Sequence, residues 1–437
     1  MTFLNGNATS PTDIDALKIA GEKAQVKGII HNIREMGEFA FIILRTGTRV
    51  IQCVYSPEFS AFELSKLHEG DCVELWGTSV EDNRAQNGFE IRISAIEVLS
   101  SPAGEYPFAI NKKILNLNLD TLLNYRPLTL RNPAQRAIFK VQEGIARGFA
   151  DFMRNEGFTE IHSPKIVAQG AEGGANIFKL DYFGQKAFLN QSPQFYKQTM
   201  VGVFERVFEV APVYRAEKHS TSRHLNEYIG LDFEMGFIKG IEDIMEMETA
   251  MLRYVMESLK TSCSYELALL KTNIPEIKKI PSITFMEAKE IITKTGKKAG
   301  KWDLEPEEEL LLCDYSRKHF GSEFIFITHF PAAKRPFYAM DDKNDDRFAL
   351  SFDLLFRGLE ITTGGQRIHD YNEQIAKMQR MGLDPAEFES YLMIHKYGMP
   401  PHGGLGIGLE RLTMKLLELK NVREASLFPR DIARLLP

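Results

Sequence analysis

The sequence has few cysteines and contains no long apolar stretch. Its 437 residues include four cysteines, which are far apart and form no CxxC pair. This spacing argues against a zinc site or a disulfide framework and is typical of a reducing compartment. No apolar run approaches the roughly 20 residues that span a membrane, and the polar, acidic N-terminus is unlike a signal peptide. We therefore expect a cytoplasmic protein that has no membrane partner.

Two common nucleotide signatures and an excess of basic charge are also missing. There is no GxxxxGK[ST] motif, and Gly404, Gly406 and Gly408 do not fit GxGxxG. The net charge is −6, so a nucleic-acid partner would have to bind at local basic patches. If the protein uses ATP, it does so through an architecture other than the P-loop or the Rossmann fold.

The N-terminal part of the chain predicts a small all-β unit. A chain of this length is expected to form two or three domains. Five strand-like runs occur between residues 24 and 100, and a short helical stretch, Ser60–Leu67, follows the third. This is the strand order of an OB-fold barrel, which often binds single-stranded nucleic acid, although a generic small β-barrel fits the same pattern. The strand-like runs are Val26–Ile33, Phe39–Arg45, Arg49–Tyr55, Asp71–Thr78 and Phe89–Leu99.

The remaining sequence divides into a linker and a larger domain. We interpret residues 1–104 as the barrel, 105–131 as a linker or hinge without clean periodicity, and 132–437 as the second domain. Asn132 and Pro133 supply an N-cap and a first helical residue, and an apolar stripe continues to a stop at Gly157. A strand containing Pro164 is expected over Phe158–Ile166, at an interface or sheet edge.

The second domain mixes helices and strands without regular βαβ alternation. This favours an α+β fold with an antiparallel sheet flanked by helices. Residues 240–320 are mostly helical and carry no chemical signal. The expected helices are Ile241–Leu259, Glu305–His319, Tyr371–Met381, Pro385–Tyr397 and Glu410–Leu419. The expected strands are Glu323–Thr328, Phe337–Met340, Ala349–Ile361 and a glycine-rich run before Glu410.

A polar loop between two strand-like runs is the first candidate site. The runs Phe208–Tyr214, interrupted at Pro212, and Tyr228–Glu234 predict an antiparallel pair. The loop places cationic side chains beside carboxylates, which suits a polyphosphate and its metal ions. A solvated hairpin tip fits the same stretch, so both alternatives stay open here. The loop side chains are Arg215, Glu217, His219, Arg223, His224 and Glu227.

Two segments near the C-terminus add candidate ligands. In the glycine-rich run that ends at Gly408, backbone can approach a ring or phosphate closely, and Arg411 could clamp a phosphate. Asp353, Glu360 and Thr363 offer hard oxygen ligands suited to Mg²⁺. The alternatives are a strand-helix corner with a surface arginine, and a buried strand followed by a glycine turn.

Two earlier segments could bind a small substrate. The segment Gln191–Gln198 places Ser192, Gln194 and Lys197 close together. The loop Gln169–Gly174 carries Glu172, which could cover a small ligand with an ammonium group. As bare sequence, both segments are equally typical of ordinary surface loops.

Together these segments resemble a class II aminoacyl-tRNA synthetase, specifically an aspartyl-tRNA synthetase of the archaeal type. The helix before Gly157 and the Pro164 strand resemble motif 1 of the family. The segments Tyr214–Glu217 and Arg223–Glu227 together resemble motif 2, and Gly406–Arg411 resembles motif 3. The resemblance covers almost the whole chain. The chain lacks the large insertion that the common bacterial form of the enzyme contains.

The resemblance implies a site that binds ATP and Mg²⁺. Arg215 would hold the α-phosphate and the substrate carboxylate, Glu217 would read the adenine amino group, and the catalytic set would be Arg215, Glu360 and Arg411. Magnesium would be held by Glu360 with Asp353 and Thr363, where the family usually has serine in place of Thr363. The implied ATP site comprises Arg215, Glu217, Arg223, His224, Leu225, Glu360, Gly408, Leu409, Glu410 and Arg411.

The resemblance also implies L-aspartate as the amino acid and tRNA(Asp) as its acceptor. Lys197 and Arg367 would face the aspartate side-chain carboxylate. Catalysis would be positioning and charge neutralisation at phosphorus, followed by transfer to the 3′-terminal ribose. A homodimer through the motif 1 helix is implied as well. The implied aspartate site comprises Glu172, Gln194, Lys197, Arg215, Thr363 and Arg367.

In the barrel, the family resemblance assigns the anticodon to His31, Arg34, Phe41 and Gln52. Phe41 would stack on a base while Arg34 and Gln52 would bond to its edges. As bare sequence, Phe41 fits a core position and Gln52 a solvated strand. Archaeal-type enzymes strict for tRNA(Asp) resemble one another in having Trp at the position of His31. The absence of Trp at this position predicts a relaxed enzyme that also charges tRNA(Asn). The loop Glu81–Asn87 matches neither the strict nor the relaxed pattern well.

Two other functions are alternatives to aspartate activation. The sister asparaginyl-tRNA synthetase shares all three motifs, but an amide gives no reason to place Lys197 and Arg367 together. A non-catalytic RNA-binding paralogue on the same scaffold would usually lack a motif arginine or a metal carboxylate. Because Arg215, Arg411 and Glu360 are all present, we favour the enzyme.

Overall fold

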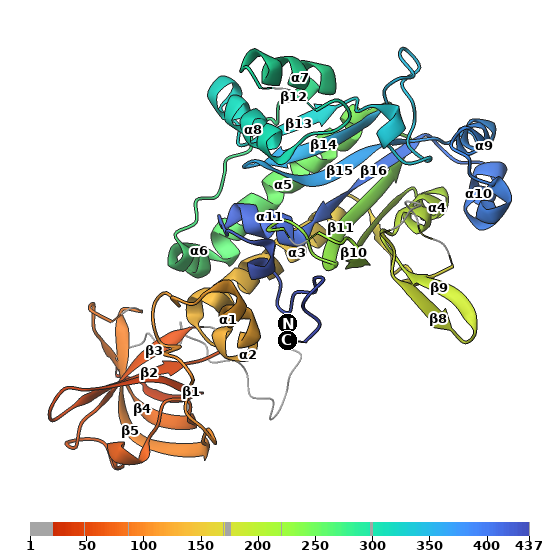
Figure 1. Cartoon of the computed structure of the whole chain (residues 1–437). Coiled ribbons are helices and arrows are strands. Elements are labelled where there is room, and N and C mark those ends of the chain that lie inside the picture. The colour runs from red at the N-terminus through yellow and green to blue at the C-terminus, as the bar shows by residue number, and fades with distance from the viewer. Residues whose placement is uncertain are drawn as a thin grey trace. The chain divides into compact units, whose positions relative to one another are not determined.

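The computed structural model describes residues 21–47, 49–85, 87–168, 170, 176–219, 221–297 and 300–436. The chain forms two compact units, one ending at Arg136 and the other beginning at Ala137 (Figure 1). Among the described helices, none is long and apolar enough to cross a membrane.

The first unit is a closed five-stranded barrel, which confirms the predicted OB-fold. Its strands pair in the order β1-β2-β3-β5-β4, and side chains that alternate along them fill the barrel interior. The short helical stretch predicted over Ser60–Leu67 is confirmed in position but is shorter, a single 3-10 turn at Leu64–Lys66. Two short helices, α1 (Leu119–Asn124) and α2 (Arg126–Thr129), lie in the segment interpreted as a linker. The strands are β1 Lys23–Glu35, β2 Ala40–Arg45, β3 Val50–Tyr55, β4 Cys72–Glu81 and β5 Phe89–Ser100.

The second unit is built on a mixed sheet of eight strands, which confirms the predicted α+β class. The strand order is β12-β13-β14-β15-β16-β11-β10-β6, and the pairs β12–β13 and β10–β6 are parallel while the others are antiparallel. A separate sheet has the order β7-β9-β8. The main strands are β6 Thr159–Glu160, β10 Arg206–Tyr214, β11 Glu227–Gly236, β12 Ser282–Thr284, β13 Phe324–Thr328, β14 Ser351–Phe356, β15 Leu359–Arg367 and β16 His402–Gly408. The smaller sheet contains β7 Ile166–Val167, β8 Lys179–Tyr182 and β9 Gln185–Leu189.

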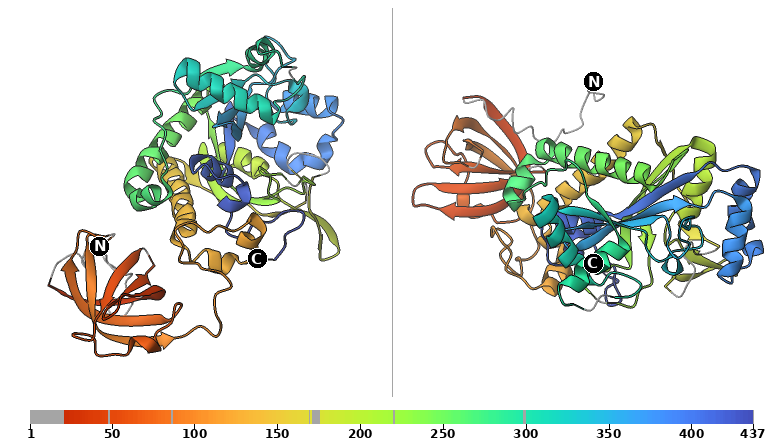
Figure 2. Two further views of the ribbon diagram at one scale, coloured as in Figure 1. Left: turned by 60° about the vertical axis from the view of Figure 1, so that its left-hand side comes forward. Right: turned by 90° about the horizontal axis from the view of Figure 1, so that it is seen from above.

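Two long helices run along one face of the large sheet (Figure 2). They are α3 (Pro133–Asn155) and α5 (Ile241–Ser262), and their apolar stripes form the main core with β10, β11, β14 and β16. The Asn132 side chain accepts from the backbone N–H groups of Ala134 and Gln135, which confirms the predicted N-cap. The other helices are α4 Gln194–Phe204, α6 Ser264–Leu270, α7 Phe285–Lys294, α8 Pro306–Phe320, α9 Tyr371–Arg380, α10 Glu389–Tyr397 and α11 Leu409–Leu416.

Four strand predictions in this unit are wrong in detail. The segment Phe158–Ile166 is not one strand, since only Thr159–Glu160 and the end of the segment pair. Strand β10 continues through Pro212, which lies opposite Ile229. No strand forms over Phe337–Met340 apart from an isolated bridge at Ala339.

The fourth difference concerns the segment Ala349–Ile361, which is not one strand. It turns back at Arg357 and Gly358, so that β14 and β15 form a hairpin. Gly358 has φ +78°, a conformation that glycine adopts readily. The alternative interpretation of this segment, a strand followed by a glycine turn, does not hold, because Gly364 and Gly365 lie inside β15.

Candidate active site

The hairpin β10–β11 confirms the predicted antiparallel pair and presents its polar loop at the open face of the sheet. Tyr214 pairs with Glu227 at the end of the ladder. The Asn226 side-chain amide donates to the carbonyl oxygens of Arg215 (2.7 Å) and Glu217 (3.0 Å). One asparagine therefore fixes the backbone on the opposite side of the loop, and with it the directions of Arg215 and Glu217.

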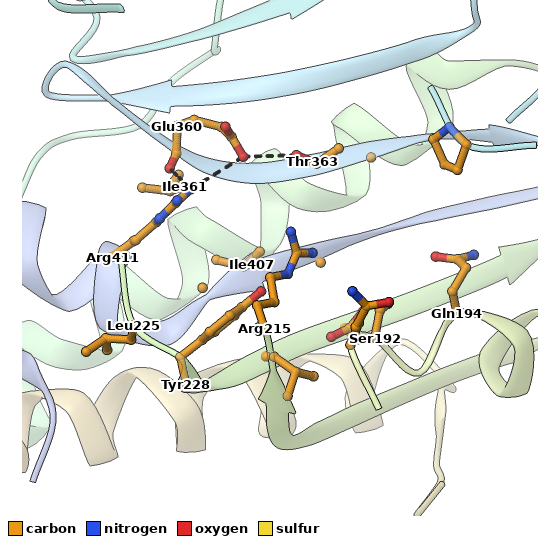
Figure 3. Close-up of a pocket in the computed structure, with 18 of the residues that line it drawn as sticks. Ser192, Gln194, Arg215, Leu225, Tyr228, Glu360, Ile361, Thr363, Ile407 and Arg411 are labelled. Atoms are coloured by element: carbon orange, nitrogen blue, oxygen red, sulfur yellow. Dashed lines mark hydrogen bonds and ion pairs between the residues drawn. The ribbon is translucent and has the colours of Figure 1, made fainter. Parts of the chain in front are cut away.

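A cavity of about 350 Å³ opens between this loop, α4, β15 and β16. Arg215, Arg367 and Arg411, which are far apart in the sequence, line it together, and Figure 3 shows Arg215 and Arg411 among the lining residues. Among the predicted residues, those that line this cavity are Gln194, Lys197, Arg215, Glu217, Arg223, His224, Leu225, Glu360, Thr363, Arg367, Gly408, Glu410 and Arg411.

Two residues of the implied ATP and magnesium sites do not line this cavity, and one residue of the implied aspartate site falls outside the described part of the chain. Leu409 is buried at the start of α11. Asp353 lines a smaller adjoining cavity of about 190 Å³, which Glu360 and Arg411 also line. Glu172 lies outside the described residues, so its assignment stays a prediction.

A bulge in β15 brings Glu360 to the cavity. On a regular strand, residues three positions apart point to opposite faces, so Glu360 and Thr363 would be separated. The register between β14 and β15 shifts by one residue, so that Leu355 pairs with Glu360 and Leu354 with Thr362. The Thr363 hydroxyl consequently reaches Glu360 and donates to its Oε1 at 3.0 Å (Figure 3).

Guanidinium groups surround the Glu360 carboxylate. Arg411 Nη1 lies 3.5 Å from Glu360 Oε1 and donates to the Glu360 carbonyl oxygen at 3.1 Å. Burial alone would raise the pKa of Glu360. The Arg411 guanidinium, the hydrogen bond from Thr363, and the charges of Arg335 and Arg223 together lower it below its usual value. Glu360 is therefore held in its charged form, as a cation ligand must be.

Asp353 is paired with an arginine that the sequence interpretation did not single out. Arg335 Nη2 donates to Asp353 Oδ2 at 2.9 Å, while Oδ1 has no partner in the described part of the chain. Burial raises the pKa of Asp353 to about 7, and Arg335 opposes this rise. Among the described residues, no three His, Cys, Asp or Glu side chains converge as a metal cage. A metal here would need ligands from a substrate as well.

His224 lies beside Glu217 and two arginines. Its Nδ1 is 2.6 Å from the Thr221 hydroxyl, and its Nε2 is 3.7 Å from Glu217 Oε2. Burial lowers the pKa of His224. Arg411 and Arg223 lower it further, whereas the Glu217 carboxylate opposes this decrease. His224 is thus suited to donating a neutral hydrogen bond rather than to acting as a cation.

The opposite end of the cavity holds a buried four-membered ion cluster. Lys197 Nζ lies 2.9 Å from Asp232 Oδ1 and 3.4 Å from Glu234 Oε2. Arg367 Nε donates to Glu234 Oε1 at 2.8 Å, and its Nη2 donates to the Gly404 carbonyl oxygen. The predicted cations Lys197 and Arg367 are therefore adjacent, but two carboxylates from β11 hold them there.

The balance between burial and charge pairing shifts the pKa values of these two carboxylates in opposite directions. Burial raises the pKa of Asp232, although Lys197 opposes it. For Glu234, burial would raise the pKa, but Arg367 and Lys197 together lower it. Near them, Gln194 Nε2 is buried in the cavity wall without a hydrogen-bond partner among the described residues, and so a ligand could accept from it.

Four functional candidates were missed by the sequence interpretation: Asp232, Glu234, Glu309 and Arg335. The first two alternate along a strand run, as solvent-facing residues do, and nothing in the local sequence indicates a cationic partner for them. Glu309 lies in the segment considered free of chemical signal. It accepts from Arg223 Nη2 at 2.7 and 2.6 Å. An acidic residue on an otherwise ordinary helix gives no local signal, because its partner is 86 positions away.

In the barrel, the predicted anticodon residues do not share one environment. Register places Arg34 opposite Phe41, and Ile43 opposite Gln52, so Arg34, Phe41 and Gln52 lie on the outer face of β1, β2 and β3. His31 falls at a register shift in β1 and is buried. Burial, with nearby arginines, lowers its pKa to about 4. The assignment of all four residues to RNA stays a prediction.

Comparison with known protein families places most of the chain in one family. Residues 118–432 match the family described as tRNA synthetases class II (D, K and N). Residues 24–99 match the OB-fold nucleic acid binding domain.

Curated relatives and solved structures agree with this match. The chain is 47% identical to an "Aspartate--tRNA(Asp/Asn) ligase" of Deinococcus radiodurans, over 95% of this chain and 96% of the relative. It is 46% identical to the protein of the same name from Thermus thermophilus, over 95% and 97%. A crystal structure of asparaginyl-tRNA synthetase from Pyrococcus horikoshii with asparaginyl-adenylate is similar with a TM-score of 0.91 at 30% identity, over 98% and 100%.

Proposed function

This chain belongs to the class II tRNA synthetases, and from that premise we propose that it is an aspartate-tRNA ligase. It would activate L-aspartate with ATP to aspartyl-adenylate and pass the aspartyl group to the 3′ end of tRNA. The observation that carries this proposal is the convergence of Arg215, Arg367 and Arg411 on one cavity, with Lys197 beside Arg367. The names of the relatives, aspartate ligases from several organisms, support it.

ATP would bind at the end of the cavity formed by the β10–β11 loop and α11. Arg215 would neutralise the α-phosphate, and Arg223 and Arg411 the outer phosphates, since forked guanidinium donors match phosphate oxygens. Glu217 would accept from the adenine amino group. No side chain here needs to act as a covalent nucleophile, because aligning the reactants and neutralising charge lower the barrier.

Magnesium would be held by Glu360 and Thr363 with Asp353, together with phosphate oxygens. The donors are hard oxygens, and the free Oδ1 of Asp353 is available for a cation. Bound Mg²⁺ would draw negative charge from the phosphate oxygens. The chain's own contribution is to keep Glu360 charged through Arg411.

Aspartate would bind at the opposite end of the cavity. Its side-chain carboxylate would lie against Lys197 and Arg367, while Gln194 and Arg215 would orient its backbone groups. Asp232 also lines the cavity and offers a carboxylate to the ammonium group. A rigid, prearranged set of donors rejects an analogue with the wrong hydrogen-bonding groups more strongly than an apolar pocket does.

Asparagine is the second candidate substrate, favoured by the fold similarity to asparaginyl-tRNA synthetase. An amide donates as well as accepts, so its NH₂ group would face the donors of Lys197 and Arg367 unfavourably. The test is ATP–pyrophosphate exchange with aspartate and asparagine side by side. We expect exchange with aspartate alone; exchange with asparagine alone would reject the proposal, and no exchange with either would favour a non-catalytic paralogue.

We further propose that the enzyme charges both tRNA(Asp) and tRNA(Asn). The relatives at 46% and 47% identity carry the name Asp/Asn, while those at 38% and 39% identity include both Asp/Asn and Asp names. The outer barrel face with Arg34, Phe41 and Gln52 is the proposed anticodon surface. Aspartylation of purified tRNA(Asn), under conditions that charge tRNA(Asp), is the expected result, and no product would contradict it.

A homodimer through the N-terminal helix of the second unit is proposed from the family resemblance. Light scattering on the purified chain should give twice the mass of 49.7 kDa. A mass that stays at the monomer value across the concentrations used for activity would reject it.

A further inference from the structure

We propose that Glu309 on α8 is a positioning residue for the triphosphate of ATP. Its carboxylate would fix Arg223 in the β10–β11 loop against Glu360 on β15, so that both meet the outer phosphates in a set geometry. This inference rests on the proposed function, since it gives a role to a group behind the same site.

The contacts of Glu309 join two parts of that site. Arg223 Nη2 donates to Oε1 and Oε2 of Glu309 at 2.7 and 2.6 Å. The backbone N–H of Glu360 donates to Glu309 Oε2 at 3.1 Å. The Glu309 side chain is 5% exposed, whereas that of Arg223 is 16% exposed. The carboxylate is thus the buried end of the pair and the guanidinium is the end that reaches the cavity.

Arg411 closes the same group of contacts from a third segment. Its Nη1 donates to the Glu360 carbonyl oxygen, and its Nε lies 3.4 Å from the Arg223 carbonyl oxygen. Glu309 therefore links the side chain of Arg223 to the backbone N–H of Glu360. Arg411 links the backbone carbonyl groups of the same two residues. Without Glu309, Arg411 would be the remaining link between the two among the residues that the structure describes.

The arrangement leaves donors of Arg223 for a phosphate. Guanidinium has five N–H donors in a rigid fork, and both contacts with Glu309 use the same terminal nitrogen, Nη2. Arg223 lines both the main cavity and the adjoining one that contains Glu309 and Asp353. A guanidinium that is already oriented loses less freedom when the phosphate binds.

The neighbouring residue on α8 provides a matched control. Glu308 is also a buried carboxylate, and it accepts from Lys289 Nζ at 2.7 Å and from the backbone N–H of Gly300 at 2.9 Å. It also accepts from the backbone N–H of Glu305 at 2.8 Å, and none of these three partners lines the main cavity. Loss of charge at Glu308 should therefore lower the stability of the fold, while loss of charge at Glu309 should weaken the binding of ATP.

The experiment compares Glu309→Gln and Glu308→Gln in aspartate-dependent ATP–pyrophosphate exchange, with melting temperature measured in parallel. For Glu309→Gln we expect the KM for ATP to rise about tenfold while the KM for aspartate stays within about twofold, because charge-assisted hydrogen bonds are roughly twice as strong as neutral ones. For Glu308→Gln we expect a lower melting temperature and an unchanged KM for ATP.

A double-mutant cycle separates positioning from a general structural effect. If Glu309 acts through Arg223, then adding Glu309→Gln to Arg223→Ala should raise the KM for ATP no further. If Glu309→Gln does not fold, Glu309→Asp, which keeps the charge but shortens the reach, serves in the same cycle. The inference is overturned if the two effects are additive, or if both KM values rise equally with a fall in melting temperature.

Failure of the proposed function gives a different result. Wild-type protein without any aspartate-dependent exchange would reject the proposed function directly. Active wild-type protein with an unchanged KM for ATP in Glu309→Gln would reject only the role of Glu309.

Discussion

The two ends of the cavity use the same chemistry, cations paired with carboxylates, at different depths. At the proposed amino-acid end, the side chains of Lys197 and Glu234 are 2% and 0% exposed. At the proposed phosphate end, those of Arg411 and Glu360 are 25% and 34% exposed. Buried pairs are costly to break and hold a fixed geometry, whereas partly exposed pairs contribute little to stability.

This difference indicates separate tasks for the two ends. A small amino acid can be selected by donors that do not move, so the groups that recognise it can be part of the folded core. A triphosphate with its cation is large and strongly charged, so the groups that meet it must be accessible. Substitutions in the Lys197–Glu234–Arg367 cluster should therefore impair folding and activity together, and substitution of the partly exposed Arg411 should impair activity alone.

The largest expected contrast is between two glycines of β16. A methyl group at Gly404 would overlap the Phe233 carbonyl oxygen and the Glu234 carboxylate, which are part of the neighbouring strand. At Gly408 the nearest atom is Arg411 Cβ at 3.6 Å. We expect Gly404→Ala to yield little folded protein and Gly408→Ala to fold normally, as measured by circular dichroism and thermal melting. Equal melting temperatures would contradict the contrast.

The next effect concerns the buried cation Arg367. Arg367→Met would leave Glu234 buried with Lys197 as its remaining cationic partner among the described residues. Removing one member of a buried ion pair typically costs about 3–5 kcal/mol, so urea unfolding should show a loss of that order together with loss of aspartate activation. Arg367→Lys keeps the charge and should recover part of the stability. A stable Arg367→Met protein would contradict the structural role of the cluster.

Arg411 at the exposed end should give the opposite pattern. Arg411→Ala should lower kcat/KM for ATP about 10²- to 10³-fold, as the loss of one charge-stabilising donor does in other enzymes. Its free energy of unfolding should change by less than about 1 kcal/mol, because the pair with Glu360 is partly exposed. Pyrophosphate exchange and urea unfolding on the same preparation measure both quantities. A large loss of stability would place Arg411 with the buried groups.

The smallest expected effect is a pH dependence of folding stability that arises from a buried carboxyl group on α5. Glu248 on α5 is buried, accepts from the Thr362 hydroxyl at 2.6 Å, and has its pKa raised to about 8 by burial. Its ordinary value is 4.5, so between these values the folded state holds a proton that the unfolded state has lost. Stability must then fall as pH rises from 4.5 towards 8.

Glu248→Gln removes this ionisation while keeping an oxygen that can accept from Thr362. The melting temperature of Glu248→Gln should therefore depend less steeply on pH between 5 and 8 than that of the wild type, on the order of a few degrees across the window. Thermal melts at several pH values measure it. Parallel curves for the two proteins would show that Glu248 titrates normally.

Much of the fold was predictable from local patterns. Alternating apolar residues gave the barrel strands, and the N-cap of Asn132 gave the start of α3. The segments around Arg215 and Arg411 were recognisable because glycine and charged residues cluster there. These signals are local in the sequence, since they come from backbone periodicity and from capping within a few residues.

The errors share a non-local cause. The hairpin between β14 and β15 turns at Arg357 and Gly358, inside a segment whose β-prone residues on both sides were expected to form one strand. Pro212 was expected to interrupt β10, but the strand passes through it because β11 pairs along its whole length. Tertiary pairing decided both cases against local propensity.

The sequence by itself determined which chemical groups this protein has and in which segments they lie, because residue identity and local periodicity are written along the chain. Only the tertiary structure decided which groups act together: the bulge in β15 that turns Glu360 towards Thr363, the carboxylates of β11 that hold Lys197 and Arg367, and the contact between Glu309 and Arg223. Each of these depends on strand register and packing between distant segments, and the free energy of such contacts has no counterpart in local sequence.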